Sequence, residues 1–238
     1  HDKMVDDFRD DLLLFSNRRS IHFPVVNSGN TRDSYHNDDV HGDRIRVLKN
    51  LMVFDDMPLA EPLLVVTSIQ ALLQPVPEKE SLRQATRTLK TGQRVDIDDL
   101  QRWFVENGYH AASAIELPGE FSRHGGILDI FAPEWDQPIR VEFWDDEIES
   151  MRLFDVRTQR SIETQTQIEL TSIRAFYQGH DHLASYLPSG SCTTLVELGE
   201  LDRQAREYIG RAADYQQCHG VHEVLATLTH FGPLVVSG

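Results

Sequence analysis

The sequence contains few cysteines, fewer basic than acidic residues and no long apolar run. Cys192 and Cys218 are the only cysteines among 238 residues, which favours a reducing compartment over a disulfide framework. No stretch approaches the roughly 20 consecutive apolar residues of a membrane-spanning helix. The first residues also lack the apolar core of a signal peptide. From these absences we expect a cytoplasmic protein with no membrane partner.

The charge balance limits the classes of partner. The 23 Lys and Arg residues face 38 Asp and Glu residues, which gives a formal net charge of -15. Because contacts with phosphates need clustered Lys and Arg, this balance argues against strong DNA binding by the chain alone. Hydrophobic residues make up 40% of the sequence, which argues against disorder and suits one large domain or two small ones.

A nucleotide-binding loop is also missing. No Gly-Lys-Ser or Gly-Lys-Thr occurs, and the stretch 24–30 after the first expected strand contains Gly29 but no lysine. Glu197 stands at the end of an expected strand, where a catalytic acid could lie. Without a lysine and ligands for Mg²⁺, we interpret it as a remnant or a helix-start residue. We therefore expect no catalytic residue and no cofactor in this chain.

Two groups of residues contain side chains of the kinds that bind metal ions. Cys218, His219 and His222 lie close together in the sequence but lack a second cysteine pair at a defined spacing. The carboxylates within 145–149 alternate between the two faces of a strand, so they do not converge on one ion. We interpret this acidic group as a solvated hairpin turn, and we expect no metal.

The central stretch 116–160 has the pattern of an antiparallel meander. Three apolar runs, at 127–131, 139–144 and 148–154, are separated by breaks rich in Gly, Pro and Asp. Such runs predict strands joined by turns.

The run 139–144 alternates between two faces. Ile139, Val141 and Phe143 fall on one face, and Arg140, Glu142 and Trp144 fall on the other. Trp and Arg are the residues most enriched at binding hot spots, so this second face predicts a protein-binding patch. The alternatives are that Trp144 covers a minor second core or is a scattered exposed apolar residue.

The flanks have α/β character. Periodicity and capping predict helices at 4–15, 43–54, after Ser68, after Asp96, 200–212 and 221–228, and strands at 20–23, 63–67, 193–198 and 234–237. The polar stretch 26–42 is predicted to be a surface loop, and the charged stretch 78–94 is predicted to lead into an inserted domain.

These elements predict three segments. Residues 1–79 and 173–238 are expected to form the two parts of one α/β domain, with 80–172 inserted as a small α+β domain. The apolar strands of the two outer segments lack partners nearby in the sequence. We expect them to meet in one sheet.

Three stretches, GEFSRHGGILDIFAP, PIRVEFWDDEIESMRLFD and TQRSI, resemble the UvrB-homology region of the transcription-repair coupling factor family, Mfd, and also UvrB itself. The Gly-Gly before Ile-Leu-Asp-Ile-Phe favours Mfd. The resemblance is strong over 80–172, moderate over 43–75 and 183–238, and weak over the first 42 residues. It implies a RecA-like domain of degenerate P-loop type, split by the inserted domain with its antiparallel sheet.

The resemblance also implies a function. It indicates a fragment without catalysis that recruits UvrA to stalled RNA polymerase in transcription-coupled nucleotide excision repair. In the family, RNA polymerase and DNA bind other domains of the full-length protein, whose motor uses ATP and Mg. The alternatives are a fragment of a UvrB-type ATP-dependent nucleic-acid enzyme, which the missing Walker lysine disfavours, and a stand-alone domain that shares only the sheet.

The family's UvrA contacts match Arg140 and Trp144 in this sequence. The family usually has Phe at the position of Trp144 and Arg at the position of His124, and a largely neutral His is expected to weaken that contact. Glu142 and Arg123 complete the expected UvrA-binding set. Arg123 is predicted to point to the opposite face unless the Gly-Gly bend redirects it.

Overall fold

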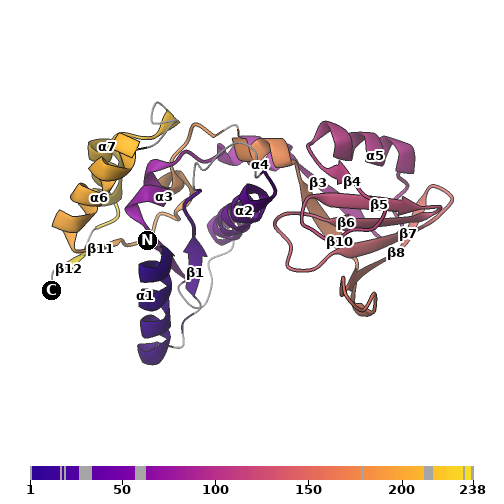
Figure 1. Ribbon diagram of the computed structural model, residues 1–238, viewed down its shortest axis with the longest axis horizontal. Helices are drawn as coiled ribbons and strands as arrows, with labels where there is room; N and C mark the ends of the chain where they lie inside the picture. The colour runs from indigo at the N-terminus through magenta and orange to yellow at the C-terminus, as the bar shows by residue number, and fades with distance from the viewer. Residues whose placement is uncertain are drawn as a thin grey trace. The chain divides into compact units, whose positions relative to one another are not determined.

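The computed structural model describes residues 2–16, 18, 20–26, 34–56, 63–177, 179–211, 217–232 and 234–236. The chain divides into two compact units. One, here called the split unit, consists of His1–Glu78 and Gly179–Gly238, and the other, the sheet unit, is Lys79–Gln178 (Figure 1). Among the helices that the structure describes, none combines the length and apolar character needed to cross a bilayer.

The sheet unit is built on six strands in the order β4-β5-β6-β7-β8-β9. The strands are β4 His110–Ala111, β5 Glu120–His124, β6 Ile127–Phe131, β7 Ile139–Trp144, β8 Glu147–Phe154 and β9 Ser161–Gln165. All neighbours from β5 to β9 pair antiparallel, and only β4 and β5 pair parallel. The predicted meander is confirmed, with the third of its strands starting one residue earlier than expected.

Sharp turns join these strands where the sequence places Gly and Asp. Gly125 has a φ of 63°, in the left-handed region that favours glycine, and it connects β5 to β6. Asp145 has a φ of 58° between β7 and β8, and Asp tolerates this conformation better than most residues. The acidic corner is therefore a hairpin turn, as predicted.

One helix covers one face of the sheet. Helix α5 (Ile97–Glu106) begins where the Asp96 carboxylate accepts hydrogen bonds from the backbone N–H groups of Asp98 and Asp99, at 2.8 and 3.2 Å. This confirms the predicted cap. Phe104 of α5 stacks on Phe121 of β5 with 5.0 Å between ring centroids. We call this covered side of the sheet the inner face (Figure 1).

A second small sheet was not predicted. Strand β3 (Thr86–Lys90) pairs antiparallel with β10 (Gln167–Thr171), and helix α4 (Lys79–Gln84) precedes β3. The sequence pattern indicated 78–94 only as a charged stretch that leads into the inserted domain, and it predicted neither of these two elements. In β3 the Thr residues favour a strand, and Leu89 buries its side chain fully, so the charges of Arg87 and Lys90 do not prevent pairing.

The split unit contains two separate pairs of parallel strands. Strands β1 (Ser20–Phe23) and β2 (Leu64–Thr67) form one pair, and β11 (Thr194–Val196) and β12 (Leu234–Val236) form the other. The prediction that these strands share a sheet was therefore wrong for the described residues.

Helix packing joins the two parts of the split unit instead. The helices involved are α3 (Ile69–Leu73), α6 (Leu198–Arg211) and α7 (Val221–Thr229). Their shared core consists of Ile69, Leu73, Leu195, Ala205, Val224 and Leu228. The apolar residues of the two segments thus meet in a core of helix side chains and Leu195 of β11, which hydrophobic periodicity does not distinguish from a shared sheet.

The remaining elements are α1 (Asp2–Phe15), α2 (Ser34–Asp56) and the 3₁₀ turns η1 (Ile173–Tyr177) and η2 (Leu183–Tyr186). The predicted helices at 4–15 and 43–54 are confirmed within α1 and α2. The predicted loop 26–42 is wrong from Ser34 onward, because α2 begins there, and residues 27–33 lie outside the described residues.

Candidate protein-interaction surface

The side of the six-stranded sheet opposite α5 forms the candidate site, and we call it the outward face. Strand pairing aligns its residues in rows across the sheet. One row is His124, Ile127, Glu142 and Ser150, and the next is Ser122, Asp129, Arg140 and Arg152. Trp144 follows two residues after Glu142, at the end of β7. The predicted alternation of β7 is confirmed, because Ile139, Val141 and Phe143 are buried.

Arg140 is bonded within the chain. Its Nε and Nη2 donate to the two carboxylate oxygens of Asp129, both at 2.7 Å, and Nη2 also donates to Gln159 at 3.0 Å. The guanidinium lies 4.6 Å from the centre of the Phe154 ring. The hydrogen bond to Asp129 raises the pKa of Arg140, so the side chain is charged at all physiological pH values.

This geometry changes the role that the sequence suggests for Arg140. Two of the guanidinium donors that could otherwise bind a carboxylate on a partner already hold Asp129, whose side chain is only 10% exposed. Among the described residues, Nη1 of Arg140 has no hydrogen-bond acceptor, so this edge remains for a partner. Arg140 is thus a fixed side chain with one open edge.

The charge of Glu142 is also balanced by a neighbouring side chain of the same unit. Its Oε2 accepts a hydrogen bond from Ser150 Oγ at 2.7 Å and another from Arg152 Nη2 at 2.6 Å. Arg152 was not among the residues predicted for this site. The alternation of β8 could have indicated it, because Arg152 lies two residues after Ser150 and so falls on the same face. The outward face therefore presents paired charges that are held in place by neighbouring strands.

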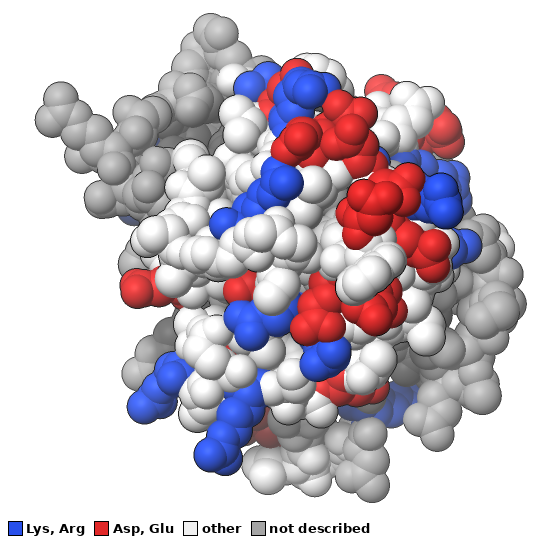
Figure 2. Space-filling model, turned by 90° about the vertical axis from the view of Figure 1, so that its right-hand side faces the viewer, with Lys and Arg blue, Asp and Glu red and all other residues white. Residues whose placement is uncertain are grey.

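Trp144 projects from the edge of this face. It is 77% exposed, which excludes the interpretation that it covers a minor core. A minor core does exist in the sheet unit, formed by Ile115, Phe131 and Phe154 with Trp135 against it. The hairpin turn after Trp144 is acidic, and acidic side chains gather on the end of the sheet unit that faces the viewer in Figure 2.

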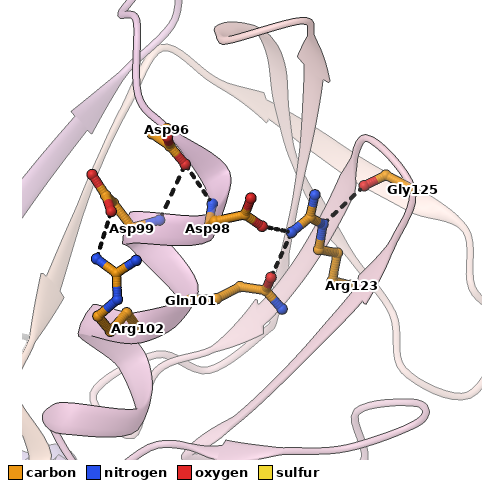
Figure 3. A network of polar contacts seen from close by, with 7 residues as sticks. All are labelled: Asp96, Asp98, Asp99, Gln101, Arg102, Arg123 and Gly125. Atoms are coloured by element: carbon orange, nitrogen blue, oxygen red, sulfur yellow. Dashed lines mark hydrogen bonds and ion pairs between the residues drawn. The ribbon is translucent and has the colours of Figure 1, made fainter.

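His124 and Arg123 lie on opposite faces. His124 belongs to the outward face, where its Nε2 lies 3.2 Å from Ser122 Oγ and 3.0 Å from the Ser113 carbonyl oxygen. Arg123 belongs to the inner face and bonds to Asp98 and Gln101 of α5 (Figure 3). The outward face thus brings together Arg140, Trp144, His124 and Glu142, and it does not include Arg123.

The segment expected to hold a degenerate nucleotide loop follows β1. Gly29 and the rest of 27–33 lie outside the described residues. Just before them, the Pro24 carbonyl oxygen accepts a hydrogen bond from Arg44 Nη1 at 2.9 Å, and Arg44 also donates to Gln74 and Pro75. Burial lowers the pKa of Arg44 to about 9, so the cation persists at pH 7 among neutral oxygen atoms.

The other candidate chemical groups have structural contacts. Glu197 has a φ of 56°, and its carbonyl oxygen accepts from the N–H groups of Glu200 and Leu201 at the start of α6, so it is a helix-start residue. His219 Nε2 lies 3.0 Å from the Asp181 carbonyl oxygen. In the part of the chain that the structure describes, no group of three or more His, Cys, Asp and Glu residues could hold a metal ion.

Comparisons with known proteins agree with the resemblance seen in the sequence. Residues 88–176, which lie within the sheet unit, match the family model of the UvrB interaction domain. The chain is 41% identical over 139 residues to the transcription-repair-coupling factor of Mycobacterium bovis, an alignment that covers 58% of this chain and 11% of the relative.

Two further relatives carry the same name. The transcription-repair-coupling factor of Bacillus subtilis is 34% identical over 122 residues, which cover 51% of this chain and 10% of the relative. That of Staphylococcus aureus strain USA300 is 33% identical over 169 residues, covering 71% of this chain and 14% of the relative. The chain therefore spans only a small part of the relatives it matches.

These findings confirm the family resemblance. Within the sheet unit, residues 88–176 match the UvrB interaction domain, and the chain as a whole is similar to a limited part of the transcription-repair-coupling factors.

Proposed function

We propose that this chain is a non-catalytic part of a transcription-repair coupling factor and that its outward face recruits UvrA. The observation that carries the proposal is Trp144, a large aromatic side chain that is 77% exposed at the edge of a sheet face on which Arg140 and Glu142 are held by ion pairs. Exposed Trp beside Arg is typical of binding hot spots. The match of this unit to the UvrB interaction domain supports the same conclusion.

The arrangement suits a preorganised interface. Arg140 is fixed by Asp129, and Glu142 by Ser150 and Arg152, so these side chains lose little conformational freedom on binding. Trp144 supplies the apolar area, and Nη1 of Arg140 supplies a charged donor. His124 lies in the same row as Glu142, and its imidazole offers fewer hydrogen-bond donors than an arginine would.

For the split unit we propose a RecA-like domain of degenerate P-loop type, interrupted by the sheet unit. Two observations support this: the chain leaves and re-enters the split unit around the sheet unit, and its strand pairs are parallel. The sequence contains no Walker lysine. Contacts with RNA polymerase and DNA, and an ATP- and Mg-dependent motor, would belong to other parts of a longer protein.

The proposal is tested by titrating purified UvrA into the wild-type chain and into Trp144→Ala. Loss of a central Trp contact commonly weakens binding by about 2 kcal/mol or more, so we expect a drop in affinity of at least roughly thirtyfold. Val105→Ala is the matched control, because Val105 is an exposed apolar residue of α5, 58% exposed. Equal affinities for the wild type and Trp144→Ala would refute the site, and no binding by any variant would refute the function.

A further inference from the structure

We infer that Arg123 is a positioning residue for the outward face. It ties the turn between β5 and β6 to helix α5 and so sets where His124 and Ile127 lie, without itself touching a partner. The inference rests on the proposed function, in which the outward face binds UvrA.

The guanidinium of Arg123 contacts two elements at once. Its Nη1 donates to the Asp98 carboxylate and, at 2.6 Å, to Gln101 Oε1, both in the first turns of α5. Its Nε donates to the Gly125 carbonyl oxygen at 3.2 Å, in the turn itself (Figure 3). One planar group therefore links the helix to the turn, which an ammonium group could not do with the same geometry.

The turn is anchored from its other side as well. The Phe143 N–H of β7 donates to the Gly126 carbonyl oxygen at 2.8 Å. A Cβ atom at Gly126 would lie only 3.0 Å from the Phe143 carbonyl oxygen, so the two strands approach closely here. The turn thus has two supports, a backbone contact with β7 and a side-chain clamp from Arg123.

The residues that flank this turn belong to the candidate surface. His124 and Ile127 pair with each other across the turn, and Ile127 pairs with Glu142 of β7. A shift of the turn would therefore change how His124 and Ile127 align with Glu142 and Trp144. Arg123 itself points away from that surface, so its effect on binding has to pass through the turn.

The clamp is partly open to solvent. The Arg123 side chain is 30% exposed, and that of Asp98 is 71% exposed. Such a pair is screened by salt and contributes modestly. Removal of the clamp should therefore loosen the turn without unfolding the sheet unit.

The test uses the full chain with Arg123→Gln, Asp98→Asn, and the two changes together. Arg102→Gln is the control, because Arg102 pairs with Asp99 within α5. Among the residues that the structure describes, Arg102 has no hydrogen bond or ion pair with the turn. Two quantities are measured: amide hydrogen exchange of the free chain over residues 122–128, and affinity for UvrA. Thermal melts verify that every variant stays folded.

We expect faster exchange at the turn in Arg123→Gln and in Asp98→Asn, with each change weakening UvrA binding about threefold, the size expected for a partly exposed ion pair. The double variant should lose no more than Arg123→Gln alone, because that change already removes the bond to Asp98. Arg102→Gln should behave as wild type. Weaker binding in Arg123→Gln with unchanged exchange at the turn would overturn the inference in favour of a direct contact.

The exchange measurement separates this inference from the proposed function. It uses the free chain and needs no partner. Unchanged exchange at the turn in Arg123→Gln would overturn the positioning role even if UvrA binds the outward face. Faster exchange in both variants would support the clamp even if UvrA fails to bind the wild type, a failure that would count against the proposed function alone.

Discussion

Replacement of Arg140 by alanine is expected to lower the stability of the sheet unit as well as its affinity for UvrA. The change removes both hydrogen bonds to Asp129, whose side chain is only 10% exposed, and leaves that carboxylate without its cation. A buried acceptor left unpaired costs about 1–3 kcal/mol. The lost stacking of the guanidinium on Phe154 adds about 0.5–1 kcal/mol at a partly exposed site.

The expected loss is therefore about 1.5–4 kcal/mol in the free energy of unfolding of this unit. For a domain of this size it corresponds to a fall in melting temperature of roughly 6 °C or more. Chemical denaturation followed by the fluorescence of the unit's tryptophans measures the loss. Arg160→Ala is the control, because Arg160 is an exposed arginine next to β9.

A second variant separates stability from binding. The double variant Arg140→Ala/Asp129→Ala also lacks the carboxylate that Arg140→Ala leaves unpaired, so part of the lost stability should return. The UvrA affinity should stay low, because the Nη1 donor is still missing. Wild-type stability in Arg140→Ala would refute this reasoning, since it would mean that the ion pair contributes nothing in solution.

Three further outcomes are expected. Gly126→Ala should destabilise the sheet unit by about 1–3 kcal/mol in chemical denaturation, because its Cβ would meet the Phe143 carbonyl oxygen at 3.0 Å, whereas Gly190→Ala, with no atom within 4 Å of its Cβ, should cost little. Burial, with a smaller effect of the Arg44 charge, lowers the pKa of His41 to about 4, so unfolding takes up a proton below pH 6.5. Stability should thus fall from about pH 6.5 to about pH 4, and less steeply in His41→Gln; equal slopes would contradict it. Calorimetry should detect no ATP binding, since the Walker lysine is missing, and a micromolar site would revive the enzyme alternative.

The parts of the fold that follow local rules could be predicted from the sequence. The Asp96 cap, the alternation of Ile139–Trp144 and the turns at Gly125 and Asp145 depend on neighbouring residues, and all of them are confirmed. Strand β3 was not predicted, because the charged residues around its threonines made the stretch look like a polar connection and hid the strand preference of the threonines. The expected single sheet failed because periodicity identifies apolar strands but not their partners.

The candidate site follows the same division. Alternation placed Arg140, Glu142 and Trp144 on one face, and the structure gives the same arrangement. The contact between Arg140 and Asp129 depends on the register of β6 against β7, a long-range property that a single sequence does not reveal. The exposure of Trp144 likewise depends on what packs over the end of β7, and the assignment of these residues to UvrA binding stays a prediction.

The central claim is that UvrA binds the outward face, and hydrogen exchange of the full chain with and without UvrA tests it most directly. We predict slower exchange in peptides that span β7 and the turn to β8, with little change in α5 on the inner face. Protection of α5 with no change around Trp144, or no protection at saturating UvrA, would contradict the account.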